Sequence, residues 1–202
     1  MSYIDTIVPA EAEGEVHDMY RRQQSGLGFV PNYARVFSHR PAVMLAWADL
    51  QRTIRENIDD KSYELVTLAA AQTLGSSYCC LAHGKKLVSA HYSEEELADI
   101  ATNPASTALT LTQQTMMRVA RKMVADSSSI SQGDIDDLRV AGYSDATIFD
   151  IAASAAARCF FAKLADSLGV QADSSFHETS EQLKAVLCVG RAISSDEPEK
   201  LD

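Results

Sequence analysis

The chain has 202 residues, of which 46% are hydrophobic and 23% charged, with a net charge of −10. This length suits one ordinary domain with a real hydrophobic core, and the composition is that of a soluble globular protein. The acidic charge argues against a protein that binds nucleic acid, because phosphate binding needs clustered Lys and Arg, and the 18 basic residues here are scattered.

The N-terminus and the cysteines indicate the cellular compartment. The opening sequence MSYIDTIVPAEAEGEV lacks the basic start and apolar run of a signal peptide, and no stretch approaches the roughly 20 apolar residues of a membrane helix. Cys79, Cys80, Cys159 and Cys188 are too few and too irregularly spaced for a disulfide-stapled secreted domain. We therefore expect a cytoplasmic protein with reduced thiols and no membrane partner.

Helical signals dominate from Pro31 onward. Proline is tolerated in a first helical turn, which predicts a short helix over 31–39. A second helix is predicted after Pro41, where apolar residues recur at helical spacing; these are Val43, Met44, Trp47, Leu50, Ile54 and Ile58. A third apolar run begins at Tyr63, after Asp59-Asp60, and ends near Gly75.

Capping residues mark the later helices. Ser93 and Glu96 have the spacing of a capping box, which predicts a helix to about residue 100. A longer helix is predicted over 109–124, and another from Ser131 to a glycine cap at Gly142. Ser144 precedes the most apolar helix, 148–168, and a last helix is predicted over 178–188.

These elements predict an all-α fold of about eight to ten helices, since no strand alternation or hairpin turn signal appears. We expect a single domain over 1–202, with an N-terminal segment 1–40, a core 41–173, and a C-terminal helix and polar tail 174–202. Alanine-rich runs from Glu64 and Asp150 suggest two related helical hairpins, although alanine-rich helices resemble one another by composition alone.

The stretch GSSYCCLAHGKKL, residues 75–87, carries the candidate chemistry. If Ser76 or Ser77 is the N-cap, Cys79 lies in the first helical turn, where free backbone N–H groups and the helix dipole favour a thiolate. His83 follows four residues later, on the same helical face. Cys80 is rotated by roughly 100° and points elsewhere.

Glu64 is predicted to reach this site from the preceding helix. If the chain reverses near Gly75, Glu64 lies eleven residues before the turn and His83 eight after it, a mismatch of about 4–5 Å that side chains can span. Cys79 would be much further from Glu64. The spacing therefore predicts a relay in which Glu64 orients His83 and His83 serves Cys79 as an activated nucleophile.

A glutamate, fifteen residues, a cysteine and a histidine four beyond it resemble the alkylhydroperoxidase D and carboxymuconolactone decarboxylase superfamily, and its peroxidase-related group in particular. Further similar segments are GFVPN at 28–32, HRP at 39–41, LRVAGYSD at 138–145 and LADSLGV at 164–170. The resemblance covers about residues 26–173. It implies an AhpD-like helical bundle and a homo-oligomer, trimeric or hexameric.

The resemblance also implies roles for these residues. Glu64 matches the proton-relay glutamate, Cys79 the cysteine that attacks the peroxide, and His83 the histidine of the relay. The resolving cysteine of the peroxidase branch falls on Ser76, which cannot form a disulfide, and a disulfide from Cys80 would close a strained ring. We expect a thiol peroxidase without cofactor, acting on small organic hydroperoxides or hydrogen peroxide with an external thiol reductant.

Other interpretations remain open at this stage. His83 and Glu64 could perform acid–base chemistry without Cys79, as in the decarboxylase branch, or the chain could be an oligomeric binding protein with a decayed site. A zinc site of Cys79, Cys80, His83 and His91 lacks the second short ligand motif that structural zinc uses, so we expect no metal. Tyr78, an accessory candidate, is most simply a core or pocket-lining aromatic residue, like Tyr63 and Trp47.

Overall fold

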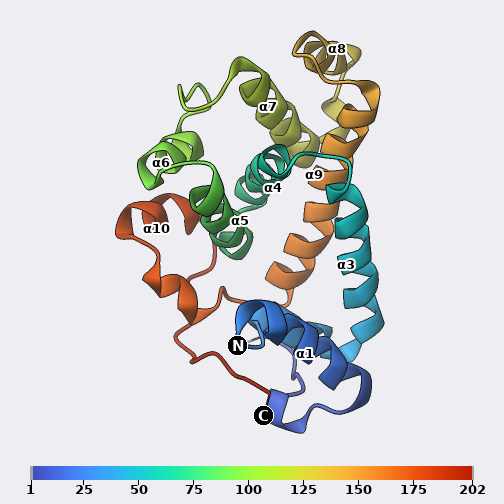
Figure 1. The fold of residues 1–202 in the computed structure, drawn as a ribbon, viewed down its shortest axis with the longest axis vertical. Helices are drawn as coiled ribbons and strands as arrows, with labels where there is room; N and C mark the ends of the chain where they lie inside the picture. The colour runs from blue at the N-terminus through green and yellow to red at the C-terminus, as the bar shows by residue number, and fades with distance from the viewer. Residues whose placement is uncertain (1, 202) are drawn as a thin grey trace.

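The computed structural model describes residues 2–201, and this part of the chain is built from helices (Figure 1). The α-helices are α1 (Gly14–Leu27), α2 (Asn32–Val36), α3 (Pro41–Arg55), α4 (Asp60–Leu74), α5 (Ser77–Ala90), α6 (Glu94–Thr102), α7 (Leu111–Ala125), α8 (Gln132–Val140), α9 (Asp145–Ser167) and α10 (Glu181–Leu187). Short 3₁₀ helices lie at Pro9–Glu11, Phe37–His39, Ser127–Ser129 and Ser174–Glu178.

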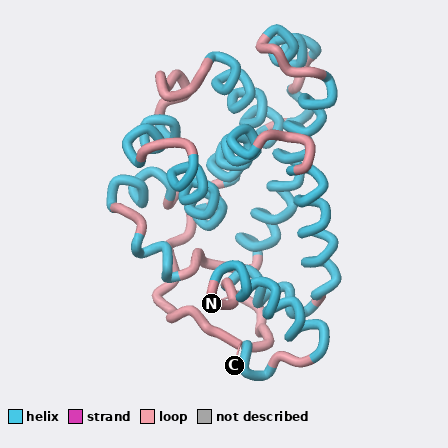
Figure 2. Tube along the Cα trace, viewed as in Figure 1, coloured by secondary structure: helices cyan, strands magenta, loops and turns pink. Residues whose placement is uncertain are grey.

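The predicted all-α class is confirmed for these residues. Figure 2 shows helices joined by loops throughout, and the only β-type pairing in the described part is an isolated bridge between Val30 and Glu199. No helix of residues 2–201 is long and apolar enough to cross a membrane.

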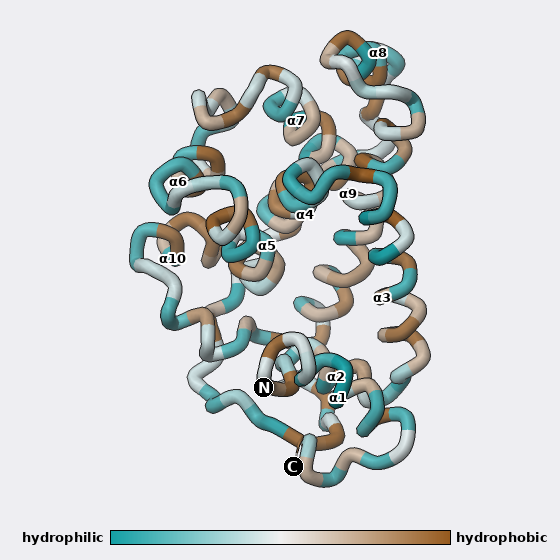
Figure 3. The backbone as a smooth tube through the Cα atoms, in the orientation of Figure 1, coloured by the Kyte–Doolittle hydropathy of each residue, from teal (hydrophilic) through white to brown (hydrophobic). Residues whose placement is uncertain are grey.

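The core is organised around α4, which packs against α5, α7 and α9. Every residue of α4 from Ser62 to Ala71 is buried, and small alanines let the neighbouring helices approach closely. Figure 3 shows mostly hydrophobic colours along α9 and hydrophilic colours at the connection between α3 and α4. Helix α4 is therefore the centre of the bundle, and the candidate functional residues described below come from α4 itself and from α5 and α9, which pack against it.

The predicted helix caps are present. Ser93 and Glu96 form a reciprocal capping box at α6, and Ser131 and Asp134 form one at α8. Ser144 accepts a hydrogen bond from the Thr147 backbone at the start of α9. These side chains satisfy backbone N–H groups that a helix start leaves unpaired, which explains why the sequence located these starts well.

Three features differ from the expectations. Helix α1 was not predicted, because it is mostly polar and only Met19 and Tyr20 of its 14 residues are buried. The C-terminal element is shorter than 178–188, since Ser180 caps α10 after a separate 3₁₀ turn. The second alanine-rich run does not form a hairpin, because α9 continues unbroken for 23 residues.

The polar tail packs back onto the N-terminal segment. The Leu201 backbone donates to Gln24 at 2.7 Å, and Arg35 pairs with Glu199 at 2.7 Å. The two ends of the described chain consequently lie near each other beside α1 (Figure 1).

Candidate active site

The hairpin of α4 and α5 places Glu64 against His83. As predicted, the chain reverses at Gly75, whose left-handed backbone (φ 69°) ends α4, and extended Ser76 then starts α5. Glu64 Oε2 lies 2.5 Å from His83 Nδ1, and both side chains are buried. The structure thus brings together the two residues that the sequence spacing paired.

Glu64 and His83 are held as a carboxylate and a neutral imidazole. Burial raises the pKa of Glu64, but the hydrogen bond and charge of His83, followed by Lys86 and Arg55, outweigh it and keep that pKa below its ordinary value. Burial, reinforced by the positive charge of Arg158, lowers the pKa of His83 to about 4. At neutral pH the Nδ1–H therefore donates to Glu64, and Nε2 is left as the basic nitrogen.

The other carboxylate oxygen of Glu64 faces two cations. Lys86 Nζ lies 3.3 Å from Glu64 Oε1, and Arg55 Nη2 lies 3.6 Å from the same oxygen. These contacts compensate the carboxylate, whose side chain is fully buried. They also fix the carboxylate orientation, and with it the imidazole.

Cys79 occupies the predicted first turn of α5, yet its sulfur contacts a residue from another helix. Arg158 of α9 donates from Nη1 to the Cys79 sulfur at 3.7 Å. Within residues 2–201 no hydrogen bond joins Cys79 to His83, although both line the same cleft. The expected relay is thus arranged with Arg158, not His83, directly on the sulfur.

Arg158 is a buried cation without a carboxylate partner. Its side chain is 4% exposed, its Nε has no hydrogen-bond partner in the described chain, and none of the ion pairs among residues 2–201 involves it. A buried guanidinium is costly unless an anion lies beside it. The Cys79 sulfur is the group in position to be that anion.

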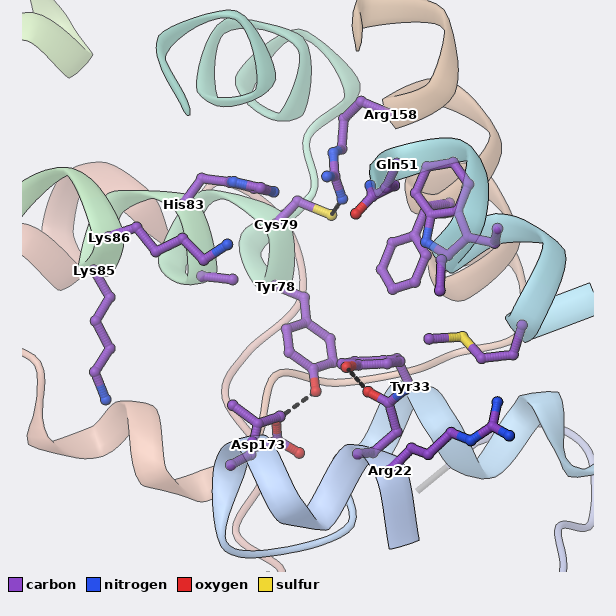
Figure 4. Close-up of a pocket in the computed structure, with 18 of the residues that line it drawn as sticks. Arg22, Tyr33, Gln51, Tyr78, Cys79, His83, Lys85, Lys86, Arg158 and Asp173 are labelled. Carbon is purple, nitrogen blue, oxygen red and sulfur yellow. Dashed lines mark hydrogen bonds between the residues drawn. The ribbon is translucent and has the colours of Figure 1, made fainter. Parts of the chain in front are cut away.

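The accessory candidates take different positions. Ser76 is buried at the start of α5, where its side chain makes no capping hydrogen bond. Cys80 is fully buried and does not line the cleft, and burial raises the pKa of its thiol. Tyr78 lines the cleft and donates to the Asp173 carboxylate (Figure 4).

A cleft of about 1100 Å³ opens over Cys79 and His83. Residues of α1, α3, α5 and α9 line it, together with the segment that follows α9. Its aromatic wall includes Tyr33, whose ring centroid lies 5.3 Å from that of Phe161, and Trp47, 5.5 Å from Phe161. The Arg158 guanidinium lies 5.5 Å from the Phe161 ring centroid, so charge and aromatic surface meet at the sulfur.

The structure does not bring together the four residues of the zinc interpretation. No group of three metal-binding side chains occurs in the described part of the chain. His91 instead lies 3.2 Å from Asp60, at the far end of α5.

Sequence reasoning missed Arg158 and Asp173. Arg158 was the available signal: it is the first charged residue after Asp150 in the alanine-rich run DIAASAAAR. Arg158 is the single charged residue of the stretch 151–162, and a charge within such an apolar stretch of a helix indicates a buried ionic role. Asp173 had no such signal, because it lies in a polar connection and reaches Tyr78 only through the tertiary fold.

The all-helical fold that carries this site is the AhpD-like fold. Two solved structures share the fold over most of both chains. A peroxidase-related protein from Ralstonia eutropha JMP134, described as an alkylhydroperoxidase AhpD core, is 21% identical, with a TM-score of 0.75 and coverage of 94% of this chain and 98% of its own. A peroxidase-related protein from Silicibacter sp. TM1040 is 20% identical, with a TM-score of 0.77 and coverage of 88% and 94%.

A third structure with the same fold has a different activity. The debrominase Bmp8, as a cysteine-to-alanine variant in complex with 2,3,4-tribromopyrrole, is 16% identical, with a TM-score of 0.72 and coverage of 89% of this chain and 98% of its own. Comparison with curated proteins finds no match.

The family model of the carboxymuconolactone decarboxylase family matches residues 41–122, which contain Glu64, Cys79 and His83. The resemblance predicted from the sequence is therefore confirmed to this extent: residues 41–122 match the family model, and the chain shares the AhpD-like fold with these structures.

Proposed function

We propose that the protein is a thiol-dependent peroxidase that reduces organic hydroperoxides or hydrogen peroxide through Cys79. The observation that carries this proposal is the hydrogen bond from buried Arg158 to the Cys79 sulfur, in a cleft that also holds neutral His83. A cation beside the sulfur is typical of the surroundings of reactive cysteines. The peroxidase-related names of two structural neighbours support the same reaction.

In the first half-reaction, the Cys79 sulfur attacks the terminal oxygen of the hydroperoxide and the O–O bond breaks. His83 Nε2 takes the thiol proton beforehand and returns it to the departing alkoxide, which leaves as an alcohol. Glu64 keeps Nδ1 protonated, so that Nε2 is the nitrogen that accepts the proton. The product at Cys79 is a sulfenic acid.

In the second half-reaction, an external thiol attacks the sulfenic sulfur and releases water, which leaves a mixed disulfide on Cys79. A second thiol then displaces Cys79 and forms the oxidised reductant. The reductant is external because Ser76 occupies the resolving position and buried Cys80 does not line the cleft. The cycle consumes one hydroperoxide and two thiols.

A second candidate is acid–base catalysis by His83 and Glu64 alone, as in the decarboxylase branch. It is favoured by the absence, within the described chain, of a hydrogen bond between His83 and Cys79, which leaves Nε2 available to a substrate in the cleft. That activity would survive Cys79→Ala, whereas peroxide reduction would not. Debromination, the activity named for Bmp8, is a further reaction to assay, and bromide release from a bromopyrrole would detect it.

The deciding experiment is detection of sulfenic acid by dimedone trapping and mass spectrometry after peroxide treatment. We expect the adduct on Cys79 in the wild type and in Cys80→Ser, the matched control, and peroxide turnover with dithiothreitol in both. Cys79→Ser should abolish turnover. An unmodified Cys79 in the wild type after peroxide treatment overturns the proposal.

We also propose a homo-oligomer, a trimer or hexamer, acting in the cytoplasm. Large apolar side chains exposed on α3 and α9 support an association surface; they are Val43, Leu50, Phe149 and Phe160. Light scattering coupled to size-exclusion chromatography measures the assembly, and a monomer at micromolar concentration would contradict it.

A further inference from the structure

The cleft over Cys79 is cationic, although the protein is acidic. Six of its lining residues are Lys or Arg and two are Asp or Glu, whereas the chain has 18 basic and 28 acidic residues. A concave surface with one sign of charge concentrates ligands of the opposite sign. Because the positive charge of the cleft is opposite to the net charge of the protein, we relate it to the ligand that enters the cleft.

Two of these cations have no partner. Arg22 of α1 and Lys85 of α5 make no ion pair or side-chain hydrogen bond within residues 2–201, and both are exposed where they line the cleft. Figure 4 shows their side chains on opposite sides of the Tyr33 and Tyr78 rings. Their charges are free for a ligand.

The remaining cations are compensated to different degrees. Arg52 pairs with Glu56 at 2.7 Å, and Arg55 pairs with Asp60 at 2.6 Å. Of the two acidic lining residues, Glu56 is thus paired with Arg52. The Asp173 carboxylate accepts hydrogen bonds from Tyr78 and from the Asn32 backbone N–H. The uncompensated charge of the cleft is consequently positive.

The size and wall of the cleft indicate an organic ligand. A volume of about 1100 Å³ slightly exceeds the range of about 300–1,000 Å³ that is usual for small-molecule sites, and it is far larger than hydrogen peroxide requires. Tyr33, Trp47 and Phe161 form a continuous aromatic wall next to Cys79, with ring centroids 5.3 and 5.5 Å apart. Such a wall binds a planar apolar body and leaves its polar end near the cations.

We infer that the cleft binds aromatic carboxylates, with the ring against Trp47 and Phe161 and the carboxylate attracted by the free cations Lys85 and Arg22, which lie on either side of the Tyr33 and Tyr78 rings. This inference names a substrate class for the proposed peroxidase. It rests on the proposed function only in taking Cys79 as the residue that reacts with the ligand. A hydroperoxide bearing a carboxylate at its distal end would thus be preferred over a neutral one.

Binding is measured with a ligand that cannot react with Cys79. Failure of this ligand to bind can then be distinguished from failure of the proposed peroxidase activity. Trp47 is the single tryptophan of the chain and lines the cleft, so its fluorescence reports occupancy. Hydrocinnamate is titrated against its neutral amide. We expect hydrocinnamate to bind at least about tenfold more tightly, which corresponds to about 1.4 kcal/mol, and its affinity to fall from about 50 to 500 mM salt.

Matched variants locate the carboxylate. Lys85→Gln and Arg22→Gln should each weaken hydrocinnamate binding by about threefold to tenfold without changing binding of the amide. The controls are Arg21→Gln, beside Arg22 but outside the cleft, and Lys163→Gln on the exposed side of α9, and neither should alter binding.

Several results would overturn the inference. Equal binding of the acid and the amide, no binding of either, or equal losses in the control variants all contradict it. Phenyl phosphate binding without hydrocinnamate binding would replace the carboxylate with a phosphate. With active enzyme, a para-carboxylated cumene hydroperoxide should show at least about tenfold higher kcat/KM than cumene hydroperoxide.

Discussion

Replacing Arg158 with methionine tests whether its charge activates Cys79. The side chain of methionine has a similar length and no charge, so Arg158→Met removes the donor at 3.7 Å from the sulfur while filling most of its space. At an effective dielectric constant of about 20, two unit charges at this distance attract by roughly 4 kcal/mol, an upper bound. The open cleft admits solvent, and we expect about 1.4–2.8 kcal/mol to remain.

That loss corresponds to a reduction of about tenfold to hundredfold in Cys79 reactivity. The assay is alkylation by iodoacetamide at pH 7, followed at the Cys79 peptide by mass spectrometry so that Cys159 and Cys188 do not contribute. Arg158→Lys keeps a positive charge and should retain part of the rate. Arg121→Met is the matched control, because Arg121 is a half-buried arginine on α7 that does not line the cleft.

Stability should move in the opposite direction. Arg158 forms no ion pair with a carboxylate in residues 2–201, so methionine removes a poorly compensated buried charge. Contacts of the guanidinium with Trp47 and Phe161 are lost, at a cost of about 0.5–1 kcal/mol. We expect the free energy of unfolding of Arg158→Met to be unchanged or higher by about 1 kcal/mol.

The alkylation assay decides the role of the charge. If Cys79 of Arg158→Met is alkylated at the wild-type rate, the charge of Arg158 does not activate Cys79.

Three further predictions concern the Glu64–His83 pair, the position of Ser76, and Gly190, which lies against Gly75. The pKa of His83 is lowered to about 4 from 6.5, so as the pH falls the unfolded state binds the extra proton first. The stability contributed by neutral His83 is therefore full above pH 6.5 and falls by up to about 3 kcal/mol as the pH drops to 4. The free energy of urea unfolding should depend less on pH in His83→Gln than in the wild type, and parallel pH dependences would contradict this. Ser76→Cys should form one intramolecular disulfide with Cys79 after peroxide, seen as a fall from five titratable thiols per chain to three. Five intact thiols would show that the geometry is unsuitable. In Gly190→Ala the new Cβ would lie 1.9 Å from the Gly75 carbonyl oxygen, so unfolding should become easier by at least about 2 kcal/mol, and a wild-type melting temperature would show that this contact is not tight.

Much of the fold could be predicted because its signals are local. The capping box at Ser93 and the serine cap at Ser144 involve residues within one helical turn, and the structure has both. The turn at Gly75 is also local, since the residue itself adopts the left-handed conformation. Helix α1 had no comparable signal, because it lies on the surface and only two of its residues are buried.

The contacts of the candidate site also differ in how far apart their residues lie in the sequence. The Glu64–His83 contact joins two helices connected by one short turn, so counting residues from Gly75 was sufficient to pair them. The Arg158–Cys79 contact joins residues 79 positions apart on helices α9 and α5. No helical periodicity reports such a pairing, which depends on how α9 packs against α4 and on which of its faces turns toward the cleft.

This division also separates two chemical tasks that a single histidine was expected to perform. An arginine side chain such as Arg158 carries a positive charge and has no acceptor nitrogen, so it can attract a thiolate but cannot take a proton from the thiol. Neutral His83 can accept a proton at Nε2 but carries no charge to stabilise the sulfur. In the proposed mechanism Cys79 therefore depends on groups from both α5 and α9. A chain that keeps the Glu64, Cys79 and His83 spacing but lacks a cation at the position of Arg158 should show slow thiol chemistry. Arg158→Met creates that chain, and its alkylation rate measures how much the spacing achieves alone.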